Sequence, residues 1–171
     1  MYKSNQLFIP YNCRSAENYM ISQYSPYSCA LDCLSSYLRE LNFDVHTSDI
    51  LKNHRDICWN DPPHANTYGA IDIERIKRLC HRYLLVCEQI TITNVSDISR
   101  IIGANECLLI YSTKFEGKDI CHTVRVVGIN SDECKIFSPK FPYGECILRT
   151  PDYINSSWGE VYWLHIRPII L

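Results

Sequence analysis

The sequence lacks a strong charge of either sign, and this removes several classes of partner. Its 171 residues carry a formal net charge of −2, and no block of like charges occurs along the chain. The chain therefore shows neither an acidic tail nor a basic arm, the kind of segment that binds nucleic acid or anionic membranes. We expect no nucleic-acid partner and no electrostatic attraction to an anionic membrane.

Long hydrophobic runs are missing as well. No apolar segment approaches the roughly 20 residues that a helix needs to cross a bilayer. The first residues, 1–6, do not show the charged segment and apolar stretch of a secretory signal. We expect no membrane partner and a cytoplasmic location, or delivery into a host cytoplasm without a classical signal peptide.

Paired metal-binding cysteines are the third absence. The chain holds ten cysteines, but no Cys-x-x-Cys occurs among them. His54, Cys58 and His64 are too loosely spaced to suggest zinc, so we expect neither a metal nor another cofactor. Most cysteines lie inside apolar segments, as Cys107 does before Leu-Leu-Ile. This placement indicates buried free thiols in a reducing compartment.

The remaining composition indicates one globular domain over residues 1–171. Hydrophobic residues make up 46% of the chain, and we find no linker, repeat or low-complexity segment. Oligomeric state is not indicated.

The first half is predominantly helical in its pattern. Apolar residues recur at helical spacing from 30 to 41, with Ser28 as a plausible N-cap. Further helices are predicted at 47–51 and 71–83, separated by a loop over 53–69. Residues 7–10 suggest a short edge strand.

The second half indicates strands. The predicted strands cover 84–88, 90–93, 107–111, 122–129, 134–138, 145–149 and 161–166. A short helix over 95–102, closed by Gly103, interrupts them. Helices followed by an antiparallel sheet predict an α+β fold.

Cys29 and His122 are the candidate catalytic pair. Cys29 stands where the apolar helical period begins, and His122 opens a strand of alternating pattern. A helix N-terminus lowers the pKa of a thiol through its dipole and its unpaired N–H groups, and a neighbouring imidazolium lowers it further. The Cys29 N–H and the amide of Gln23, six residues upstream, are candidate oxyanion donors. Taken singly, each residue has an ordinary structural explanation, and Cys33 is only a weak second candidate nucleophile.

Together these residues resemble the signature of the C39-like cysteine peptidases, which have a papain-like fold. The segment Gln23-x5-Cys29-Ala-x-Asp32-Cys-Leu is similar to the family's Gln-x5-Cys-Gly-x-Ala-Cys-Leu. The strand His122-x-Val-x-Val and the pair Ser138-Pro139 correspond to the family's His-x-Val-x-Val and Asp-Pro. Gly144 and the segment 153–158, which ends in a Trp, resemble its closing region. The resemblance covers roughly residues 20–166.

The resemblance implies a role for each matching residue. Gln23 would be the oxyanion donor, Cys29 the nucleophile and His122 the general base. Ser138 stands where the family has an Asp that orients the imidazole, and a serine brings no charge to that position. Asp32 replaces a small residue, and we expect it on the solvent side of the helix.

Three functions follow as alternatives. The first is a cysteine peptidase or amidase that forms a thioester at Cys29 on a peptide or protein substrate. The second applies the same chemistry as a glutamine deamidase or acyltransferase, with a secreted effector as one form of this alternative. The third is a catalytically impaired module that binds a peptide, which Ser138 favours and the retained set of Gln23, Cys29 and His122 disfavours.

Overall fold

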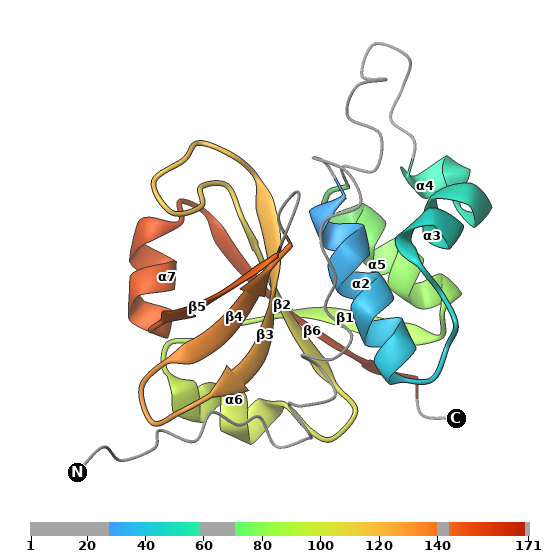
Figure 1. The fold of residues 1–171 in the computed structure, drawn as a ribbon. Coiled ribbons are helices and arrows are strands. Elements are labelled where there is room, and N and C mark those ends of the chain that lie inside the picture. Colours follow the sequence, from blue (N-terminus) through green and yellow to red (C-terminus); the bar gives the residue numbers. More distant parts are fainter. Residues whose placement is uncertain (1–27, 59–70, 140–143, 170–171) are drawn as a thin grey trace.

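The structure is a computed structural model, and it describes residues 28–58, 71–139 and 144–169. Helices α2 to α5 precede all the described strands, and α6 and α7 are inserted between strands (Figure 1). The described helices are α2 Cys29–Glu40, α3 Thr47–Asn53, α4 Arg55–Cys58, α5 Ile73–Arg82, α6 Val95–Ile101 and α7 Pro151–Ser157. The strands are β1 Leu85–Ile90, β2 Cys107–Ser112, β3 His122–Ile129, β4 Cys134–Ser138, β5 Glu145–Arg149 and β6 Val161–Pro168.

The six strands form one sheet in the order β1-β6-β2-β3-β4-β5. Every neighbouring pair is antiparallel. The predicted α+β fold, with helices packed on an antiparallel sheet, is confirmed. Strand β3 lies inside the sheet, and all of its residues are buried. Its first residue, His122, pairs with Ser112 of β2, whereas the register with β4 begins at Arg125.

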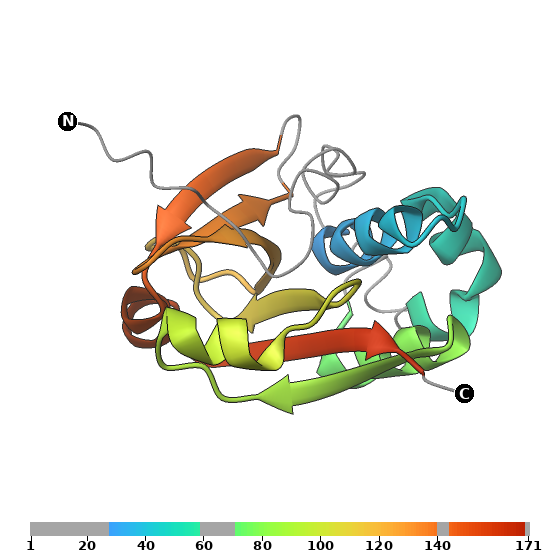
Figure 2. The ribbon, with the colours of Figure 1, turned by 90° about the horizontal axis from the view of Figure 1, so that it is seen from below.

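The sheet has a hydrophobic core on each face (Figures 1 and 2). The first core joins α2, α3, α4 and α5 to residues of β1, β2 and β6. The second joins α6 and α7 to residues of β2, β3, β4 and β6. Successive residues of one strand point to opposite faces of the sheet, so Leu108 and Leu109 of β2 lie in different cores.

Helix α2 begins where its apolar period begins, as the sequence predicts. Ser28 occupies the N-cap position, but its hydroxyl makes no capping bond to the helix backbone. It donates instead to the carboxylate of Asp32, at 2.9 Å. The backbone carbonyl of Ser28 accepts the first helical bond, from the Asp32 N–H.

The structure corrects three expectations about the elements. The region 53–58, expected as loop, contains the short helix α4. The segment 151–157, for which we expected no helix, forms α7. The two predicted strands over 84–93 are a single strand that ends at Ile90. The predicted strand over residues 7–10 lies outside the described residues. None of the helices in the described segments is long and apolar enough to span a bilayer.

Candidate active site

Cys29 is the first residue of α2, and its side chain faces the start of β3. The residue as a whole is half-buried. It contacts the backbone and the hydroxyl of Thr123, the residue after His122, and the backbone of Ala30. The helix terminus and the strand therefore meet at the residue beside His122.

The pKa of Cys29 moves against our expectation. Burial raises the pKa of the thiol above its ordinary value of 9.0, and the nearby carboxylate of Asp32 adds to this rise. Hydrogen bonds from the backbone of Thr123 and Ala30 act in the opposite direction, but they do not outweigh burial. The resting thiol is therefore protonated at neutral pH, and the helix N-terminus does not make it a thiolate.

Asp32 is the second correction at this site. We expected it to face solvent, but it is buried, with only 1% of its surface exposed. Its carboxylate accepts hydrogen bonds from Ser28, at 2.9 Å, and from the hydroxyl of Thr47, at 2.7 Å. Asp32 thus connects the first turn of α2 to the start of α3. The two hydroxyl donors offset the cost of burying its carboxylate.

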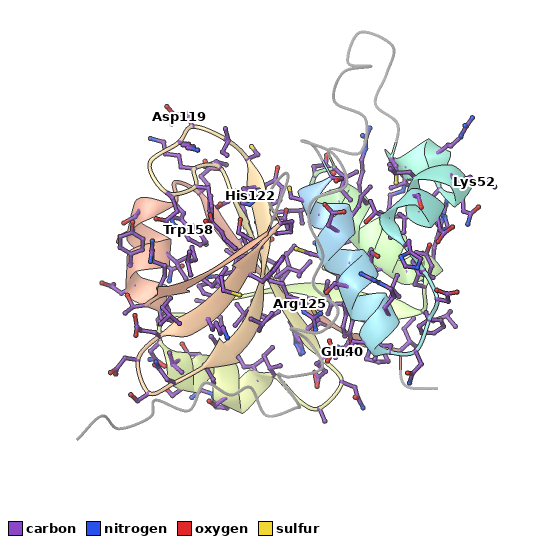
Figure 3. All side chains as sticks on the ribbon, viewed as in Figure 1. Glu40, Lys52, Asp119, His122, Arg125 and Trp158 are labelled. Atoms are coloured by element: carbon purple, nitrogen blue, oxygen red, sulfur yellow. The ribbon has the colours of Figure 1, made fainter. Side chains whose placement is uncertain are left out.

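His122 and Ser138 lie together. Nε2 of the imidazole is 2.8 Å from Oγ of Ser138, and both side chains are buried. The ring of Phe115 lies 4.6 Å from the His122 ring, and Trp158 lies 4.8 Å beyond Phe115, measured between ring centroids. The two aromatic rings therefore pack on the side of the imidazole. Figure 3 shows His122 on the sheet close to the end of α2 that carries Cys29.

Burial also decides the charge of His122. It lowers the pKa of the imidazole from 6.5 to about 4. The ring is therefore neutral at neutral pH and is able to accept a proton. If Nε2 carries the hydrogen and donates it to Ser138, Nδ1 is left as the basic nitrogen.

The structure brings His122 and Ser138 into contact, but it joins Cys29 to His122 only through Thr123. Among the contacts between described residues, none is a hydrogen bond from the Cys29 thiol to the His122 ring. Catalytic hydrogen bonds are often long or misaligned before substrate binds, so a catalytic pair is compatible with the absence of a direct bond between the thiol and the imidazole. Gln23 lies outside the described residues.

Cys33 is unsuited to the role of a second nucleophile. It is fully buried, and its thiol donates to the Thr123 carbonyl at 3.7 Å. Burial raises its pKa well above the ordinary value. Its place is in the first core, between α2 and β3.

Three neighbours of the pair were not predicted from the sequence. Thr123 contacts the thiol, and Phe115 covers the imidazole. Tyr111 of β2 is the third neighbour: burial raises its pKa to about 12, and Cys29 contributes a smaller part of this rise. Thr123 was open to prediction, since it follows the candidate base directly. Nothing in the local pattern of residues 113–118 indicates that Phe115 folds onto His122.

No three His, Cys, Asp or Glu side chains within the described residues gather as metal ligands would. His54, considered above as a zinc ligand, instead bonds the Tyr83 hydroxyl through Nε2, at 2.9 Å. Arg82 approaches its Nδ1 at 3.2 Å.

Comparisons with known proteins give a fold. No protein-family model matches the chain, and neither does any curated protein sequence. Among solved structures, the peptidase domain of Streptococcus ComA, a bifunctional ABC transporter involved in quorum sensing, matches with a TM-score of 0.61. The match has 12% identity and covers 88% of this chain and 98% of that domain.

A second solved structure is a double-glycine-motif protease from an AMS/PCAT transporter, in complex with a leader peptide. It matches with a TM-score of 0.56 and 12% identity over 96% of this chain and 93% of its own. At this identity the likeness concerns architecture. The chain has the papain-like fold of the C39-type peptidase domains.

Proposed function

We propose that the protein is a cysteine peptidase that cleaves an amide bond of a peptide substrate through a thioester at Cys29. The observation that carries the proposal is the hydrogen bond between Nε2 of His122 and Ser138, at 2.8 Å behind Phe115, in a strand whose next residue contacts the Cys29 thiol. The fold shared with two peptidase domains supports the same reading. One of those neighbours holds a leader peptide, which supports a peptide as substrate class.

In the proposed mechanism, the resting pair is uncharged. The raised pKa of Cys29 and the lowered pKa of His122 leave a thiol beside a neutral imidazole at neutral pH. The thiol turns from Thr123 toward His122 when substrate arrives. Nδ1 of His122 accepts the thiol proton as sulfur attacks the carbonyl carbon, and Ser138 holds the ring through Nε2.

The remaining steps return the enzyme to its starting state. The Cys29 N–H and the Gln23 amide stabilise the oxyanion. His122 gives its proton to the leaving amine, and a thioester remains on Cys29. Water then attacks the thioester with His122 as base, and the acid product leaves as the thiol is reprotonated.

The test is cleavage of a proteome-derived peptide library, with new N-termini identified by mass spectrometry. We expect Cys29→Ala and His122→Ala each to lower kcat/KM for the best peptide by at least about 1,000-fold, because both residues take part in bond making. An acid-quenched reaction should show an acyl group on Cys29. Cys146→Ala, which removes an exposed thiol from β5, is the matched control and should leave cleavage unchanged.

A second candidate function is peptide binding without cleavage. The raised pKa of Cys29 and the uncharged partner of His122 favour it, because both weaken a thiol nucleophile. Peptides that bind to wild-type protein and to Cys29→Ala equally, with no cleavage in either, would establish binding and refute the peptidase proposal. The neighbours give no support to the deamidase and acyltransferase alternatives.

A further inference from the structure

A tight turn between β2 and β3 carries the aromatic ring that packs on His122. Phe115 and Lys118 form an isolated bridge, with N–H···O bonds of 3.0 Å in both directions. The two residues between them have positive φ angles, 47° at Glu116 and 80° at Gly117. Positive φ at both central positions is characteristic of a type I′ turn, in which asparagine or aspartate usually precedes the glycine. Glutamate is an unfavourable residue at this first position, because a long side chain gains no local hydrogen bond that offsets the left-handed backbone.

The carboxylate of Glu116 is held by two side chains from other elements. Arg149 of β5 donates to both of its oxygens, from Nε at 2.9 Å and from Nη2 at 2.8 Å. The indole N–H of Trp158, which caps the end of α7, donates to Oε1 at 3.2 Å. A bidentate pair of arginine and carboxylate fixes geometry as well as adding energy. The turn is therefore attached to both β5 and α7.

The backbone before the turn is attached to the same region of the molecule. The Thr113 N–H donates to the carbonyl of Glu160, and the Lys114 N–H donates to the carbonyl of Trp158, each at 3.0 Å. The Thr113 hydroxyl also accepts from the Glu160 N–H, at 2.8 Å. Phe115 is therefore held from both directions along the chain, by these backbone bonds on one side and by the Glu116 side chain on the other.

Phe115 carries this placement to the candidate base. Its ring is buried and lies between two others, with centroids 4.8 Å from Trp158 and 4.6 Å from His122. In Figure 3, Asp119 marks the loop that follows the turn, with His122 and Trp158 below it. The hydrogen bond to Ser138 restrains the imidazole at Nε2 alone, so the plane of the ring depends on the side chains that pack against it.

We propose that Glu116 is a positioning residue for His122. Its carboxylate, bound by Arg149 and Trp158, holds the Phe115 ring against the imidazole and so fixes the plane of the ring. The chain tolerates a glutamate at a positive φ because its side chain completes this connection, as strained backbone near functional sites often does. The inference rests on the proposed function where it concerns catalysis, because the direction of Nδ1 matters for proton transfer only if His122 is the base.

The test compares Glu116→Asn with wild type in the full-length protein. Asparagine suits the positive φ and keeps the turn, but its short uncharged side chain does not form the bidentate pair. By NMR, the ring-proton resonances of His122, identified by their loss in His122→Gln, should move toward those of an exposed histidine as the ring current of Phe115 is lost. For the best peptide, kcat should fall roughly 10- to 100-fold with KM little changed, because misplacing a catalytic group by about 1 Å costs about that much.

Two further variants separate this role from a merely structural one. Arg149→Lys keeps the charge but not the forked donor, so it should reproduce part of both changes. Glu88→Gln breaks the exposed pair with Arg167, at 2.8 Å, and should produce neither change. His122 resonances at their wild-type positions in Glu116→Asn or in Arg149→Lys overturn the inference, whether or not the protein cleaves a peptide. Shifted resonances, together with a wild type that cleaves nothing, support the positioning of the ring and count against the peptidase proposal alone.

Discussion

At the scale of single residues, the decisive feature of the candidate site is that its imidazole is held without a charge. Ser138 occupies the position from which a carboxylate would orient His122, and it makes the hydrogen bond at 2.8 Å. A hydroxyl fixes the ring but does not stabilise an imidazolium, whereas a carboxylate does both. The hydrogen bond therefore orients the His122 ring while the ring remains neutral at neutral pH, as the proposed mechanism requires.

Replacing Ser138 with Asp tests this interpretation. We expect the carboxylate to raise the pKa of His122, and the imidazolium so favoured to lower the pKa of Cys29. The measurement is the rate of Cys29 alkylation by iodoacetamide between pH 5 and 8, with site mapping. Ser138→Asp should increase the rate at pH 6 by roughly tenfold, the effect of one unit of pKa.

Ser138→Asn is the matched control, since it adds the same bulk without the charge. It should label no faster than wild type. If Asp and Asn accelerate labelling equally, the effect comes from altered packing, and Ser138 is not the position that sets the charge of His122.

The sequence indicated candidate residues for the site, but it did not indicate their environment. The order Cys29, His122, Ser138 follows from local motifs, and the structure brings His122 and Ser138 together. The burial of Asp32 was not predictable, because its partner Thr47 begins a different helix. The direction of the Cys29 pKa shift was missed for the same reason. The local sequence indicates that Cys29 begins a helix, but the burial that raises its pKa depends on residues distant in the sequence.

At the scale of elements, α2 is fastened to β3 along its length. Arg125 of β3 is completely buried and donates to Ser36 at 2.7 Å. It also forms an ion pair with Glu40 near the end of α2, and its guanidinium lies 5.5 Å from the Tyr37 ring centroid. Figure 3 shows Arg125 and Glu40 below His122, toward the other end of the helix. These contacts of Arg125 hold α2 against β3, the two elements whose other ends carry Cys29 and His122.

We expect Arg125→Met to lower the free energy of unfolding by about 3 to 5 kcal/mol, because Glu40 is left charged and buried. Denaturant unfolding measures the loss. The double variant Arg125→Met, Glu40→Gln should recover part of it, since neither charge then remains.

The exposed pair Arg167 and Glu88, at 2.8 Å, provides the control for this prediction. Arg167→Met should cost less than about 1 kcal/mol, as exposed pairs do. A loss at Arg125 no larger than the loss at Arg167 would show that the buried pair does not hold α2 on the sheet.

Most elements were predicted, the short helices α3 and α6 included, but α4 and α7 were not. Helices α2 and α5 and strands β2 to β6 follow from apolar spacing. The buried residues of α7 are Pro151 and Ile154, with Trp158 at the C-cap, and these are too few to establish a period. Its start was nevertheless readable: Thr150 accepts from the Tyr153 N–H, and Pro151 occupies the first turn, a common helix beginning.

At the scale of the whole molecule, the site lies where the two cores meet. Cys29 begins the helix that covers one face of the sheet, while His122 packs against Phe115, which with Trp158 belongs to the core of the other face. The sheet that contains β3 lies between these two cores. The relative placement of Cys29 and His122 therefore depends on the packing of both cores. The buried imidazole also links the stability of the fold to pH.

This link has a definite sign. The pKa of His122 falls from 6.5 to about 4 in the folded protein, so between these values the unfolded chain binds a proton that the folded chain does not. Stability contributed by the neutral ring is present above pH 6.5 and is lost as the pH falls toward 4, by about 3 kcal/mol in total. Denaturant unfolding at pH 7, 5.5 and 4 should show a steeper loss for wild type than for His122→Gln, which does not titrate. Parallel curves for the two proteins would mean that the imidazole is not held neutral by burial, and the uncharged resting pair proposed for the mechanism would then fail with it.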